Sequence, residues 1–160
     1  MTTPWKLALA LGLAGITASC GSPESEEKEA PVFTKVPAET QVQNARLILP
    51  AVSGNPAAVY FDMTYVGDDV SLDGASVEGA ERTELHEHAM VDGMARMQEM
   101  DPLPLTGGNA YNFEPGGNHL MVFGVGDDLQ AGGTARVTLT AGDATVAQFD
   151  AEIRGAGEAR

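Results

Sequence analysis

The sequence VTLTAGDATVAQFDAEI, residues 137–153, predicts a β-hairpin. Val137, Leu139 and Val146 are apolar between polar neighbours, and this alternation is typical of strands that bury one face. Gly142 and Asp143, which lie between the two halves, favour a tight turn. The second half of the chain is therefore expected to end in antiparallel β-structure.

The same pattern of short strands and turns extends back to about residue 42. Runs rich in β-branched and aromatic residues alternate with turn-forming segments, and no sustained helical period occurs. The expected strands are residues 45–52, 57–66, 70–77, 82–91, 94–100, 119–125, 134–141 and 144–153. Their number and spacing predict an all-β single domain, an antiparallel β-sandwich over residues 42–154, with a short flexible tail at 155–160.

The first 19 residues differ from the rest of the chain and predict a secretory signal. Lys6 is their only charged residue, and residues 7–16 form an apolar run that is too short to span a bilayer permanently. TASC, residues 17–20, resembles the lipobox of bacterial lipoproteins, so Cys20 is expected to carry lipid and to begin the mature protein. A plain signal peptide with cleavage nearby and a short membrane anchor are the alternatives.

Residues 20–41 are expected to form the lipidated cysteine and an acidic, flexible tether. The segment GSPESEEKEAP, residues 21–31, is polar, acidic and rich in small residues. Gly21 follows the cysteine where Asp would signal retention in the inner membrane. This favours a periplasm-facing protein on the outer membrane over one on the inner membrane.

The charge of the chain argues against nucleic acid as a partner. Removal of residues 1–19 takes away one basic residue of 9 and none of the 23 acidic ones, which leaves 8 basic residues and a formal charge of −15. Phosphate backbones bind poorly to such a surface. Cys20 is the only cysteine, so no intramolecular disulfide can form and the domain must fold through its core.

Histidine and methionine gather in one part of the sequence. All three histidines and five of the seven methionines lie between residues 86 and 121, mainly in TELHEHAMVDGMARMQEM, residues 83–100. Imidazole nitrogen and thioether sulfur together suit Cu(I) better than magnesium, calcium or structural zinc. The alternative is that the methionines fill gaps in the core and the histidines are ordinary strand residues.

The spacing of four of these residues resembles a known signature. His86, Met97, His119 and Met121 fit the pattern H-x10-M-x21-H-x-M of the periplasmic copper chaperones called PCuAC. NPAAVYFDMTYVG, TELHEH and FEPGGNHLMVFGV are also similar to segments of that family, and the resemblance covers roughly residues 42–153. It implies a cupredoxin-like sandwich that binds Cu(I) through these four side chains. It also implies delivery of copper towards the binuclear copper centre of cytochrome c oxidase, with the subunit that holds this centre or its assembly factors as partners.

Two features of the expected site follow from strand geometry. His119 and Met121 are two residues apart on one strand, so they project from the same face. Asp92-Gly93 predicts a two-residue hairpin loop that sets His88 opposite Met97. His88 is therefore a possible auxiliary ligand, with an exposed strand histidine as the equally open alternative.

Other functions compete with that of a copper chaperone. A copper-sequestering envelope lipoprotein without a dedicated acceptor needs the same site, so the sequence does not separate the two. A blue-copper electron carrier needs a cysteine thiolate, which the domain lacks. Glu84, Glu87 and Glu99 could form an acid/base set with the histidines, but we expect these carboxylates on a solvated strand face and no enzyme activity. A purely structural β-sandwich is the remaining alternative.

Overall fold

The computed structural model describes residues 40–158, and all regular elements in this range are strands. The predicted signal, Cys20 and nearly all of the tether lie outside the described residues. Across residues 40–158 there is no helix long and apolar enough to span a bilayer. The strands are β1 (Gln41–Ile48), β2 (Ala57–Thr64), β3 (Val70–Leu72), β4 (Gly74–Val77), β5 (Ala80–Val91), β6 (Met94–Glu99), β7 (Leu103–Leu105), β8 (Ala110–Phe113), β9 (His119–Val125), β10 (Thr134–Ala141) and β11 (Ala144–Arg154).

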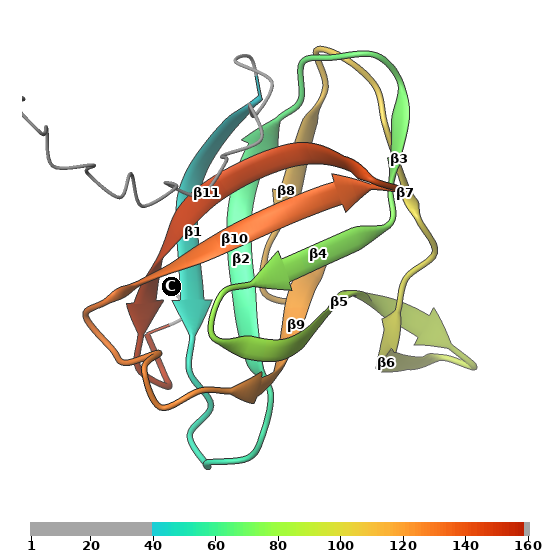
Figure 1. Cartoon of the computed structure of the whole chain (residues 1–160). Helices are drawn as coiled ribbons and strands as arrows, with labels where there is room; N and C mark the ends of the chain where they lie inside the picture. Colours follow the sequence, from blue (N-terminus) through green and yellow to red (C-terminus); the bar gives the residue numbers. More distant parts are fainter. Residues whose placement is uncertain (1–39, 159–160) are drawn as a thin grey trace, which may run out of the picture. The chain divides into compact units, whose positions relative to one another are not determined.

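The strands form one large sheet that folds back on itself and one small two-stranded sheet. The large sheet runs in the order β4-β10-β11-β1-β2-β9-β5-β6, with β8 paired to β2, while β3 pairs with β7. In Figure 1, β4, β10 and β11 form the layer nearer to the viewer, and β2, β8 and β9 lie behind them. The predicted all-β sandwich is confirmed. Its one parallel pair is β1 with β11; the other strand pairs are antiparallel.

The core lies between the two layers and is built from alternate residues of the strands. On β2, Val59, Phe61 and Met63 are buried while their neighbours face outwards. Phe61 stacks on Phe113 of β8, with 4.3 Å between ring centroids. This alternation is what a strand with one apolar face produces. The core therefore fixes β2, which lies next to β9 in the sheet.

The C-terminal hairpin agrees with the prediction. Val137, Leu139 and Val146 are all buried, and Ala141 lies opposite Ala144 across the predicted turn. Gly142 has a positive φ of 56°, a conformation that glycine adopts readily.

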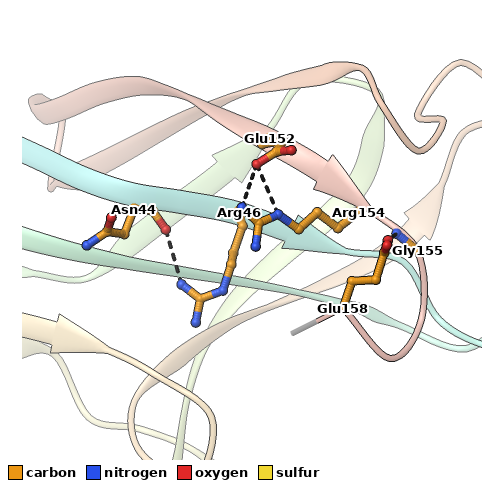
Figure 2. Close-up of polar contacts among 6 residues, drawn as sticks. All are labelled: Asn44, Arg46, Glu152, Arg154, Gly155 and Glu158. Atoms are coloured by element: carbon orange, nitrogen blue, oxygen red, sulfur yellow. Dashed lines mark hydrogen bonds and ion pairs between the residues drawn. The ribbon is translucent and has the colours of Figure 1, made fainter. Parts of the chain in front are cut away.

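The first strand and the 70–77 segment differ from expectation. β1 begins at Gln41 and ends at Ile48, four residues earlier at each end than predicted. Its irregular part is Asn44, which has φ 55° and lies where the β1–β2 register shifts. Figure 2 shows this region, where the Asn44 carbonyl accepts a hydrogen bond from Arg46 and Glu152 pairs with Arg154 at the end of β11.

Residues 70–77 form two strands rather than one. Asp73 separates β3 from β4, and its carboxylate accepts hydrogen bonds from the backbone N–H of Gly142 at 2.9 and 3.1 Å. β3 then pairs with β7 while β4 pairs with β10. The strands β7 and β8 were not predicted. β7 contains Pro104, and Gly107 and Gly108 lie between the two strands; proline and glycine are uncommon inside strands.

Candidate metal centre

Three adjacent strands carry the predicted donors. Strand β5 lies between β9 and β6, and in this register His86 is opposite His119 while His88 is opposite Met97. Residues that are directly opposite on antiparallel strands project from the same face, as do residues two apart on one strand. Met121 is two residues from His119. The structure thus brings all five predicted side chains to one face of the sheet.

His119 is the buried member of this group. Only 2% of the residue is exposed, and it is the one buried polar residue among residues 40–158. Its Nδ1 lies 3.0 Å from the carbonyl oxygen of Gly117, which can only accept, so Nδ1 carries the proton. The other nitrogen, Nε2, is buried without a hydrogen-bond partner. The ring therefore presents one lone pair to its surroundings.

His86 presents a second unpaired nitrogen. Its side chain is 13% exposed, and its Nε2 lies 3.0 Å from Oε2 of Glu84, while Nδ1 is buried without a partner. The rings of His86 and His119 have centroids 6.1 Å apart. Leaving a buried nitrogen without a partner is costly, and two such nitrogens lie here on neighbouring rings, where their lone pairs are available to a ligand.

Glu84 corrects one expectation from the sequence. Its side chain is only 21% exposed, and besides His86 it contacts Arg82, whose Nε lies 3.1 Å from Oε1. It is therefore part of the histidine cluster and not a carboxylate on a solvated face. Alternation along a strand could place Glu84 beside His86, but no sequence signal indicated the contact.

His88 and Met97 form the open side of the cluster. His88 is exposed, yet its ring centroid is 5.5 Å from that of His119. This distance is shorter than the 6.1 Å between the ring centroids of His86 and His119. Met97 is 46% exposed. The predicted register of this hairpin is confirmed, since Asp92 and Gly93 both have positive φ and Val91 lies opposite Met94.

Tyr60 completes the surroundings of His119 and was not singled out from the sequence. The centroid of the Tyr60 ring is 6.1 Å from that of His119. The Arg46 guanidinium lies over the Tyr60 ring, 5.3 Å from its centroid. Burial raises the pKa of the Tyr60 hydroxyl, with Arg46 opposing this shift. The phenol therefore stays protonated and forms an uncharged wall on the β2 side.

Electrostatics keep His119 neutral. Burial lowers the pKa of His119, the hydrogen bond to Gly117 opposes this shift, and positive charge on His88 or His86 would lower the pKa further. A neutral imidazole is the form that binds a metal.

The donors on this face are imidazoles and thioethers. In the part of the chain that the structure describes, no group of three or more His, Cys, Asp or Glu is arranged to hold a metal ion. The thioethers of Met97 and Met121 project from the same face of the sheet as the imidazoles. Such a mixture suits a soft ion.

Comparison with known proteins places the chain in a family. Residues 40–153 match the model of the family described as putative lipoprotein LpqE-like. The chain belongs to this family. It is 26% identical over 115 residues to the putative lipoprotein Lxx21020 of Leifsonia xyli subsp. xyli (strain CTCB07). The aligned residues cover 71% of this chain and 69% of that protein.

Solved structures share the fold at low sequence identity. The copper-bound PCuAC domain from PmoF2 is 17% identical, with a TM-score of 0.56 over 72% of this chain and 92% of that one. The apo PCuAC domain from PmoF1 is 20% identical, with a TM-score of 0.56 over 72% and 93%. Apo-DR1885 from Deinococcus radiodurans is 24% identical, with a TM-score of 0.53 over 100% and 95%. The fold is therefore that of the PCuAC domains, as the sequence resemblance implied.

Proposed function

We propose that this lipoprotein binds Cu(I) through His86, Met97, His119 and Met121 and acts as a copper chaperone of the bacterial envelope. It is a binding protein and not an enzyme. The observation that carries the proposal is the pair of buried, unpaired ring nitrogens, His86 Nδ1 and His119 Nε2, on the same sheet face as two thioethers. Neutral imidazole and thioether ligands bind Cu(I) without releasing a proton from sulfur.

The exposure of the cluster fits reversible binding. His119 is buried while Met97 and His88 are exposed, so a bound ion would be held from the inside and reached from the outside. A partner could then replace the outer ligands one at a time. The fold likeness supports the same function, because one solved PCuAC domain is described as copper-bound.

Anaerobic titration with Cu(I) and a competing chelator tests the proposal. The wild type is expected to bind one ion, and His119→Ala is expected to bind far more weakly, because it removes the buried imidazole. Glu87→Gln is a suitable control, since Glu87 lies on the other face of β5 and contacts Gln98. Absence of Cu(I) binding by the folded wild type would overturn the proposal and favour a structural role.

The acceptor that we propose is the binuclear copper centre of cytochrome c oxidase. The alternative is sequestration without a dedicated acceptor, which needs the same ligands. Mixing the copper-loaded protein with an apo oxidase copper-centre domain separates the two. A chaperone transfers its copper faster than the copper dissociates into a chelator, whereas a sequestering protein shows no such acceleration.

We further propose that Cys20 carries lipid and holds the domain at the periplasmic side of the outer membrane. The family's description as putative lipoproteins supports this anchor. A tether confines the search for a partner to the membrane surface and so raises the local concentration. Cys20→Ser should release the protein into the soluble fraction, and unchanged membrane association would overturn the assignment. Separation of inner and outer membranes shows which one holds the wild type.

A further inference from the structure

We propose that Glu84 is a positioning residue that makes His86 coordinate copper through Nδ1, whereas His119 coordinates it through Nε2. This inference rests on the proposed function, because it assigns the ligating atoms of the same site. It adds a residue outside the four-residue signature. It also predicts that the two histidines bind through different ring nitrogens.

The contact between Glu84 and His86 sets the proton position. Nε2 of His86 lies 3.0 Å from Oε2 of Glu84. An ionised carboxylate only accepts hydrogen bonds, so Nε2 must donate and therefore carries the proton. A neutral imidazole has one N–H, which leaves the lone pair on Nδ1. That is the nitrogen of His86 that is buried without a partner.

Glu84 is itself held from a second side. Arg82 Nε lies 3.1 Å from Oε1, so the two carboxylate oxygens have different partners. The Arg82 guanidinium lies over the ring of Phe123, 4.3 Å from its centroid, and Phe123 is directly opposite Arg82 in the β5–β9 ladder. The chain of contacts from Phe123 through Arg82 and Glu84 to His86 keeps the carboxylate available to the imidazole. Such partners orient metal-binding histidines.

His119 is oriented by a backbone carbonyl instead of a carboxylate, and its proton lies on the other ring nitrogen. Its Nδ1 donates to the backbone carbonyl of Gly117, and its Nε2 is the buried nitrogen without a partner. Gly117 belongs to the turn just before β9, so side-chain substitution does not remove this acceptor. Glu84 is the acceptor that substitution can remove, and this makes the proposal testable.

Three variants separate the roles of Glu84. Glu84→Gln keeps an acceptor oxygen but has no negative charge. Glu84→Leu has neither. Glu87→Leu is the matched control, because it removes the same charge from the same strand on the other face. Circular dichroism checks that each variant is folded.

The readout is long-range ¹H–¹⁵N NMR of the histidine rings, before and after addition of Cu(I), which is diamagnetic. In the apo wild type, the ring proton is expected on Nε2 of His86 and on Nδ1 of His119. Cu(I) is expected to shift Nδ1 of His86 and Nε2 of His119 and to leave both protons in place. Glu84→Leu should lose the slowly exchanging Nε2 proton of His86 and bind Cu(I) about 10- to 100-fold more weakly. Glu84→Gln should stay close to the wild type on both measures, and Glu87→Leu should match the wild type.

Two outcomes would overturn the inference and leave the proposed function standing. In the first, Cu(I) binds His86 through Nε2, which means that copper displaces Glu84. In the second, Glu84→Leu and Glu87→Leu weaken binding equally, which means that only net charge matters. If no ring nitrogen responds to Cu(I), the proposed function fails and this inference fails with it, even where the apo tautomers are as expected.

Discussion

His86 and His119 stand directly opposite each other on β5 and β9, with their ring centroids 6.1 Å apart and their planes inclined by 51°. The next pair along the ladder, Leu85 and Leu120, points to the other face and is buried in the core. Core packing therefore fixes the backbone from which both imidazoles project. The part of the face that carries these two imidazoles is therefore held in place by the hydrophobic core behind it.

The apo domain is expected to be folded, because its core does not depend on a metal. Circular dichroism of the metal-free protein should show β-structure, and chemical unfolding should be cooperative. Cu(I) at a free concentration 100 times its dissociation constant should then add about 2.7 kcal/mol to the free energy of unfolding by binding linkage. A random-coil spectrum without metal would contradict both the preformed site and this expectation.

Met97→Leu and Met121→Leu are expected to keep the fold and to weaken Cu(I) binding. Leucine is close to methionine in volume, so the cost in stability should stay below about 1.5 kcal/mol, but leucine has no sulfur donor. Competition titrations measure the affinity, and urea unfolding measures the stability. Met94→Leu is the control, because Met94 is also exposed but projects from the opposite face of the hairpin. Unchanged affinity in both site variants would remove the thioethers from the site.

The stability of the apo protein should fall as the pH drops below about 6.5, the ordinary pKa of histidine. Burial lowers the pKa of His119 in the folded state. In the window between the lowered pKa and the ordinary one, the unfolded chain binds a proton that the folded chain does not, so acid favours unfolding. Below the folded pKa this contribution has been lost in full.

Urea unfolding of the wild type and of His119→Gln between pH 7.5 and pH 5.5 checks this expectation. His86 and His88 are present in both proteins, so the difference in slope isolates His119. The wild type should lose stability more steeply with acid than the variant does. Equal slopes would show that His119 does not carry the effect.

The local features of the site could be predicted from the sequence, and its long-range features could not. Asp92-Gly93 fixes the β5–β6 register within a few residues, so the pairing of His88 with Met97 followed from turn chemistry. The pairing of His86 with His119 joins residues 33 positions apart, and no turn sets it. Only the resemblance to a known signature suggested that these two residues meet.

The contacts of Glu84 could not be predicted from the local sequence either. A carboxylate two residues from a histidine on a strand is commonly solvated, and nothing in TELHEH shows that Arg82, which lies over the Phe123 ring, will contact it. Tyr60 likewise reaches His119 only through the pairing of β2 with β9. Both contacts depend on strand neighbours that the local sequence does not encode.

His88 is expected to act as a substitute ligand when His86 is removed. Its ring centroid is 5.5 Å from that of His119, and Met97 lies directly opposite it. Both contacts place His88 within side-chain reach of an ion held by His119 and Met97. A rotation of an exposed side chain is enough to bring the imidazole in, and it costs no buried packing.

Cu(I) affinities of His86→Ala, His88→Ala and the double variant test this role. If His88 replaces His86, the double variant should lose more binding free energy than the sum of the two single losses, because each histidine compensates for the absence of the other. Met90→Ala is the control, since Met90 lies on the same face of β5, two residues beyond His88, and is 70% exposed. Additive losses with a silent His88→Ala would leave His86 as the sole imidazole ligand from β5, and Nδ1 of His86 would then have no substitute.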